Sequence, residues 1–153
     1  MAGQTNIGGI FSIAVQSDGT TPDTNNSILT ASQFAALSYV AIANMGSHGD
    51  TGVDQNLVNY DTWDRLSQKQ KGMAIGKDVE VAFLDETSVC MTALKAAADI
   101  VETDNFAFKI LWPDTTVEYY RGVVAAPSYN KGGGEDFKVV TFTIGINQES
   151  IFA

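Results

Sequence analysis

The sequence is short of the side chains on which many enzymes and metal proteins depend. Its 153 residues include one cysteine, Cys90, and one histidine, His48. A single cysteine excludes an internal disulfide framework, and the two residues together leave little from which to build a metal cluster. We therefore expect no cofactor and no bound metal.

Basic residues are also scarce, since 9 Lys and Arg face 18 Asp and Glu, for a net charge of −9. A protein that grips nucleic acid or an anionic membrane surface needs the opposite sign. No apolar run approaches the roughly 18–20 residues of a membrane span, and the N-terminus lacks the basic start and apolar run of a signal peptide. We expect no membrane insertion and synthesis in a cytoplasm.

The composition is that of a folded protein, with 44% hydrophobic and 18% charged residues. These proportions are globular and not those of a disordered chain. The length suits one unit with a substantial core. We expect residues 1–153 to form a single domain.

Two patterns that suggest catalysis have simpler explanations. Asp50-Thr51-Gly52 spells the tripeptide of aspartic proteases, but it follows a polar segment and not the apolar strand end that such sites use. Cys90 falls on the apolar stripe of an expected helix, where a thiol acts as a small hydrophobe. We expect His48 to lie in solvent. The sequence predicts that the protein is not an enzyme.

The clearest structural signal is a β-hairpin over residues 105–124. Phe106, Phe108, Ile110 and Trp112 alternate with Ala107, Lys109 and Leu111, which is the period-two pattern of a strand. Pro113-Asp114 predicts a chain reversal. The returning strand places Tyr119 and Arg121 on one face, and Tyr120 and Gly122 on the other.

The remaining pattern predicts five more strands and one confident helix. Four of the strands are expected over 6–16, 65–75, 79–83 and 137–146. Another strand, into which Phe34, Leu37, Val40 and Ile42 lead, is expected to end near Met45. Thr30 or Ser32 could cap a brief helical turn before it. The helix is expected over about 86–102, capped by Asp85 or Thr87, with Cys90, Ala93, Leu94, Ala97 and Val101 buried. The predicted fold is mainly β (α+β), a β-sandwich or barrel of about six or seven strands with one flanking helix.

Residues 46–64 are expected to form an unusually long polar loop. Loops of this length inside compact domains are commonly functional. This one carries apolar and aromatic residues that are unusual in water (Leu57, Val58, Tyr60 and Trp63). Tyr119 and Tyr120, which point in opposite directions, add to the apparent excess of exposed aromatic surface. Either the chain is an ordinary sandwich whose loop folds back on its own core, or it is a subunit that pairs its edge strands with neighbours in a ring.

The hairpin also carries a family resemblance. Its aromatic strand, its turn Trp112-Pro113-Asp114-Thr115-Thr116 and its return strand Val-Glu-Tyr-Tyr-Arg-Gly-Val-Val resemble the hairpin of lambda-like siphophage tail tube (major tail) proteins. Trp112, Pro113, Tyr119, Tyr120, Arg121 and Gly122 are the residues that match. Phe34, Leu37 and Val40 are similar to that family's entry to its second strand.

The resemblance implies a structural virion protein with the phage tail tube fold. Six copies would form a ring, and rings would stack around a tape measure protein between a tail tip or baseplate initiator and a tail terminator. DNA would pass non-specifically through the lumen, and the net acidity would prevent it from sticking. The chain would be assembled in the host cytoplasm and located in the virion tail.

In this picture, the 46–64 loop makes the ring-to-ring contact through Asp50, Asp54, Leu57, Val58, Tyr60 and Trp63. Two alternatives stay open. One is a tube protein like that of type VI secretion, and the other is a soluble β-sandwich binding module.

Overall fold

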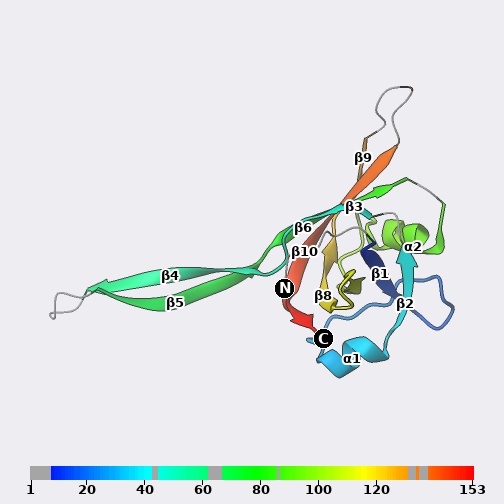
Figure 1. Ribbon diagram of the computed structural model, residues 1–153. Helices are drawn as coiled ribbons and strands as arrows, with labels where there is room; N and C mark the ends of the chain where they lie inside the picture. Colours follow the sequence, from blue (N-terminus) through cyan, green and yellow to red (C-terminus); the bar gives the residue numbers. More distant parts are fainter. Residues whose placement is uncertain (1–7, 43–44, 62–66, 86, 131–133, 135–137) are drawn as a thin grey trace.

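The computed structural model describes residues 8–42, 45–61, 67–85, 87–130, 134 and 138–153 (Figure 1). Within this part of the chain there are ten strands and two helices. The strands are β1 (Ile10–Val15), β2 (Ser38–Ile42), β3 (Met45–His48), β4 (Val53–Asp61), β5 (Ser67–Gly76), β6 (Asp78–Leu84), β7 (Phe106–Leu111), β8 (Val117–Val124), β9 (Ser128–Asn130) and β10 (Val139–Phe152). The helices are α1 (Ala31–Ala36) and α2 (Val89–Ala97).

Eight of these strands form one antiparallel sheet that makes up the body of the molecule. Its order is β2-β1-β7-β8-β10-β6-β3, and β9 pairs with the beginning of β10. The sheet curls over so that distant strands face each other, since the rings of Phe11 in β1 and Phe83 in β6 are 5.2 Å apart. The prediction of a mainly β fold with a sandwich-like core is confirmed.

The strand count was too low because polar composition hides three strands. β3 and β4 occupy most of the segment 46–64 that was expected to be a loop, and β9 begins the connection expected over 128–136. All three are poor in buried apolar residues, so they lack the alternation from which strands are recognised. The expectation that residues 46–64 form a long loop is therefore wrong, because most of this segment is β-strand.

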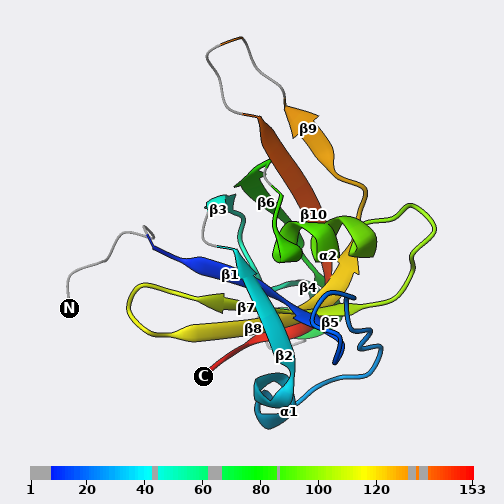
Figure 2. The same ribbon diagram turned by 90° about the vertical axis from the view of Figure 1, so that its right-hand side faces the viewer.

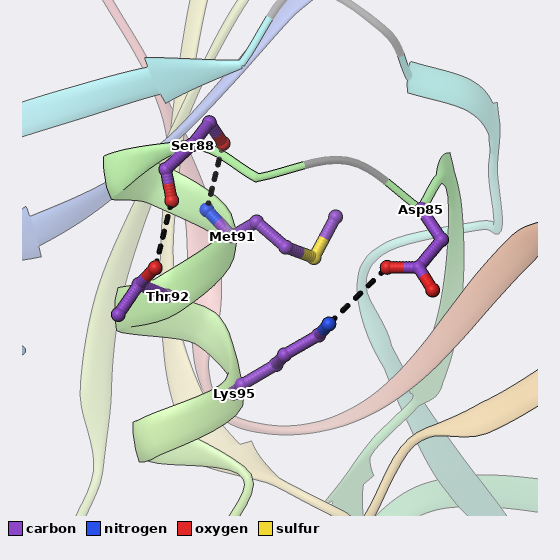
Figure 3. Close-up of polar contacts among 5 residues, drawn as sticks. All are labelled: Asp85, Ser88, Met91, Thr92 and Lys95. Carbon is purple, nitrogen blue, oxygen red and sulfur yellow. Dashed lines mark hydrogen bonds and ion pairs between the residues drawn. The ribbon is translucent and has the colours of Figure 1, made fainter.

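Helix α2 covers the inner face of the curled sheet (Figure 2) and is shorter than predicted. Ser88 caps it, because its Oγ accepts from the Met91 amide at 3.1 Å, so the expected cap at Asp85 or Thr87 is wrong. Asp85 instead pairs with Lys95 at 3.2 Å (Figure 3).

The predicted burial is confirmed for Cys90, Ala93, Leu94 and Ala97. It is wrong for Val101, which is 82% exposed. The helix has ended by then, and the chain turns where the Glu102 amide donates to the Asp99 carbonyl. Residues beyond Ala97 consequently no longer share its helical face.

Helix α1 covers part of the opposite, outer face of the sheet. Thr30 caps it in a capping box with Gln33, as one of the two expected caps. Its one buried side chain, Phe34, stacks on Tyr119 at 5.3 Å. Tyr119 is 6% exposed and Tyr120 is fully buried, so the expectation that these tyrosines are left exposed for neighbours is wrong.

The hairpin β7–β8 is confirmed, with Ala107 paired to Arg121 and Phe108 to Tyr120. Its turn closes where the Thr115 amide donates to the Trp112 carbonyl at 3.0 Å. The Asp114 carboxylate accepts from the Thr116 amide at 2.9 Å, which lowers the pKa of that carboxyl.

Close packing between β8 and β10 explains why residue 122 is a glycine. A Cβ at this position would collide with the carbonyl oxygen of Gly145 in β10, so only glycine fits without a shift of the backbone. Next to it, Arg121 is buried, and its guanidinium donates to Gln148 Oε1 and to the carbonyls of Asn25 and Asn147. Four of the six matched hairpin residues (Tyr119, Tyr120, Arg121 and Gly122) are therefore part of the structural framework.

Candidate functional site

The most distinctive surface of the molecule is an arm formed by β4 and β5. These two strands pair only with each other and project away from the body (Figure 1). None of the arm's side chains belongs to the core clusters of the described residues. The arm therefore contributes surface and not core.

The arm carries a concentration of exposed apolar side chains. Five of the thirteen large hydrophobic residues that are exposed in the described chain lie on it: Val53, Leu57, Val58, Met73 and Ile75. Leu57 and Val58 are 62% and 55% exposed and, as successive strand residues, point to opposite faces. Exposed apolar residues clustered in this way mark interaction surfaces.

Lysines give one face of the arm a positive character. The register pairs Leu57 with Lys71 and Asn59 with Lys69. Paired residues of antiparallel strands share a face, so Leu57 lies beside two lysines. The opposite face pairs Val58 with Gln70.

The base of the arm is packed tightly against β10. A Cβ at Gly76 would collide with the carbonyl oxygen of Ile146. The Ile146 amide donates to the Lys77 carbonyl at 3.1 Å, and the Lys77 amide donates to the Gly52 carbonyl at 3.0 Å. An exposed ion pair between Lys77 Nζ and Asp54 at 3.8 Å adds little. The backbone contacts fix where the arm leaves the body.

Two side-chain hydrogen bonds hold the segment before the arm against β8. His48 Nε2 lies 3.0 Å from the Tyr120 hydroxyl, and the Thr51 hydroxyl donates to Glu118 at 2.7 Å. His48 Nδ1 lies 2.7 Å from the Gly49 carbonyl, which can only accept, so Nδ1 carries the proton and Nε2 accepts from Tyr120. The expectation that His48 lies in solvent is therefore wrong.

Burial dominates the electrostatics of this cluster. It lowers the pKa of His48, because the charged imidazolium is disfavoured away from water, while the Gly49 carbonyl and Glu118 oppose that shift. It also raises the pKa of Tyr120, with a further contribution from the negative charge of Glu118. Both shifts favour the neutral side chains, which can form the hydrogen bond from the Tyr120 hydroxyl to His48 Nε2.

The predicted interface residues are only partly brought together. Asp50 and Asp54 are exposed, and Leu57 and Val58 lie on the arm. Tyr60 belongs to β4, and Trp63 lies outside the described residues. The matched hairpin residue Trp112 is half-buried with its ring 6.0 Å from that of His48, while Pro113 is exposed in the turn. Sequence reasoning missed Lys69 and Lys71, whose alignment with Leu57 depends on the strand register.

The candidate catalytic groups do not form a catalytic arrangement. Both ring nitrogens of His48 are occupied as described, and burial raises the pKa of the Cys90 thiol to about 12. Thr51 bonds to Glu118, and no group of three metal-ligating side chains occurs in the described ranges. In the same part of the chain, neither helix combines the length and apolar character needed to cross a bilayer.

Comparison with known proteins finds similarity in fold but not in sequence. No protein-family model matches the sequence. No curated protein matches it either. The fold is nevertheless similar over the whole chain to chains in three solved structures of contractile injection systems and related particles.

A chain from the sheath/tube terminator of an extracellular contractile injection system, PVC, in its extended state has a TM-score of 0.67 at 8% identity, with 100% of this chain and 98% of that chain covered. A chain from the six-fold symmetrised baseplate of the anti-feeding prophage has a TM-score of 0.64 at 5% identity, with 100% and 97% covered. A chain from the tube-terminating cap of the same particle has a TM-score of 0.60 at 7% identity, with 100% and 94% covered.

At such low identities the likeness concerns the fold alone. The fold of this chain is one that occurs in phage-tail-like assemblies.

Proposed function

We propose that this chain is a structural subunit of a phage-tail-like tube, which assembles into hexameric rings that stack through the β4–β5 arm. The observation that carries the proposal is the arm itself. The body already has a closed core, yet the chain extends two long strands with exposed apolar side chains into solvent. An isolated two-stranded hairpin is at best marginally stable in water, so such an arm suits a surface that a partner covers.

The fold likeness and the hairpin motif support the same proposal. The chains with this fold come from particles with a tube, a baseplate and a cap. The Trp112 turn and the Tyr-Tyr-Arg-Gly strand match the lambda-like tail tube pattern. In the proposed tail, the further partners are a tape measure protein, an initiator and a terminator, and DNA passes through the lumen.

Two of the similar structures favour a second candidate, a ring that ends a tube. One contains a sheath/tube terminator, and the other contains a tube-terminating cap. Such a subunit would form a single ring on a tube made by another protein, and would not form stacks of its own. Electron microscopy separates the two, because a tube subunit gives long tubes and a terminator gives isolated rings.

The test uses the full chain and a variant without the arm. Residues 56–73 are replaced by an Asn-Gly turn between the paired residues Gln55 and Ala74, which keeps the base of the hairpin. We expect negative-stain images of the concentrated wild type with a tail-tip initiator to show rings and tubes. The variant should fold, since it loses no core residue, but remain monomeric. Tubes built by the armless variant would refute the role of the arm, and a wild type that never forms rings would refute the tube assignment.

A further inference from the structure

We propose that the arm of one copy docks into an acidic groove on the body of a second copy. The groove has a volume of about 490 Å³ and lies on the outer face of the sheet, beside the turn that follows α2. Its lining includes Val123, Gly145 and three acids, Asp78, Asp99 and Glu102. This inference rests on the proposed function and adds the surface that receives the arm.

The floor of the groove is open and largely apolar. Gly145 faces outward, because its neighbours Ile144 and Ile146 are both buried in the core. A Cβ at Gly145 would make only ordinary contacts, at 3.4 Å from Val123 and 3.5 Å from the Asp78 carboxylate. The absence of a side chain here leaves space above the strand. Ile100, which is 87% exposed, adds apolar surface at the edge.

The acids at the groove are held in place without a cation. Glu102 accepts from the amides of Thr103 and Asp104, both at 3.1 Å, and Asp99 accepts from the Val101 amide at 3.3 Å. In the described residues, neither they nor Asp78 forms an ion pair. Three carboxylates around an apolar floor favour a ligand with an apolar centre and positive charges around it.

The arm presents that combination. Leu57 lies on the same face as Lys69 and Lys71, and all three are exposed. The other described cations are mostly engaged: Lys77 pairs with Asp54, Lys95 with Asp85, Lys109 lies over the Tyr39 ring and Arg121 is buried. Among the described basic side chains, Lys69, Lys71 and Lys138 are therefore the ones left without a partner.

The geometry requires that the groove belong to another copy. Asp78 adjoins the base of the arm, whereas Lys69 lies seven residues before Gly76 along β5. At ~3.3 Å per residue, this places Lys69 about 23 Å from the base. The arm projects away from the body, so it cannot reach its own groove while β4 and β5 stay paired (Figure 1). The contact is head-to-tail, and repeating it generates a ring or a stack.

The test is a charge-swap pair. One variant carries Lys69→Glu and Lys71→Glu, and the other carries Asp78→Lys and Asp99→Lys. Both are checked for folding by circular dichroism, and assembly is followed by sedimentation velocity and electron microscopy with the same initiator. We expect each variant alone to need at least a tenfold higher concentration to assemble. An equimolar mixture should assemble like the wild type, because reversed arms meet reversed grooves and native arms meet native grooves.

The matched control carries Asp23→Lys and Asp114→Lys, which change the net charge as much as the groove variant does. Neither acid lines the groove or the base of the arm, so the control should assemble normally. Groove variants that assemble like the wild type, or a mixture that fails to recover, would overturn the docking site. If the groove variant assembled like the wild type while the arm variant did not, the arm would bind elsewhere and the proposed function would stand. A wild type without any assembly would instead reject both.

Discussion

Replacing Phe34 by alanine tests whether the outer face of the sheet is covered by the chain itself or by a neighbour. Phe34 is fully buried, stacks on Tyr119 at 5.3 Å, and its carbonyl accepts from the Tyr39 hydroxyl at 2.7 Å. It is the one buried side chain of α1, so no other residue of that helix can replace it. Phe34 should therefore contribute to the stability of the isolated monomer.

The expected loss follows from the size of the side chain. Truncation of a fully buried phenylalanine to alanine costs about 3–5 kcal/mol, of which the aromatic pair accounts for about 0.5–1.5 kcal/mol. The free energy of unfolding is measured by urea denaturation of dilute, monomeric protein. Phe152→Ala is the matched control: this side chain is 63% exposed, and its loss should change the stability by less than about 1 kcal/mol.

A double-mutant cycle with Tyr119→Ala isolates the contact between the two rings. The coupling should be at least about 0.5 kcal/mol, because the residues touch directly. A loss below about 1 kcal/mol for Phe34→Ala in the monomer would refute the reasoning. It would mean that the sheet face around Tyr119 is completed by a neighbouring subunit, in line with one of the two alternatives that the sequence left open.

Three further predictions concern the backbone and one buried histidine. Thr115→Gly should raise the free energy of unfolding by about 1 kcal/mol in the same assay, because Thr115 has a φ of +71° and a β-branched residue is strained there. An unchanged free energy of unfolding would contradict the turn geometry. Gly122→Ala should lower it by about 1–3 kcal/mol, because the added Cβ meets the Gly145 carbonyl, whereas Gly134→Ala, with open space around it, should be neutral. The pKa of His48 is lower in the folded than in the unfolded protein, so the stability should fall as the pH drops through 6.5 and below. In a series of thermal melts at different pH, His48→Gln should reduce this fall. A variant whose stability depends on pH below 6.5 just as the wild type's does would contradict the burial of His48.

The body of the fold was predictable where an element buries one face. Buried residues alternate with more exposed ones in β6 and along most of β10, and the small residues of α2 mark a helix close to a sheet. The end of α2 was not predictable in this way. Val101 continues the helical spacing, but the turn at Asp99 removes it from the buried face.

Contacts between distant segments also lay beyond sequence reasoning. His48 looked exposed because its neighbours in the chain are polar. Its burial depends on Tyr120, which is 72 residues away. Likewise, the fit of Gly122 beside Gly145 follows from the order of strands in the sheet, which the local pattern does not specify.

Of the two arm strands, β5 corresponds to the strand expected over 65–75, whereas β4 was missed for a reason that bears on its function. A strand is recognised most readily when one face is apolar and buried, but the described side chains of β4 bury neither face. The apolar residues of β4 are distributed over both faces, with Leu57 and Val58 pointing in opposite directions. A chain that needs only solubility would place polar residues on at least one of those faces. The distribution of apolar residues that hid β4 from sequence reasoning is thus the one that the proposed contact of the arm with other copies would require.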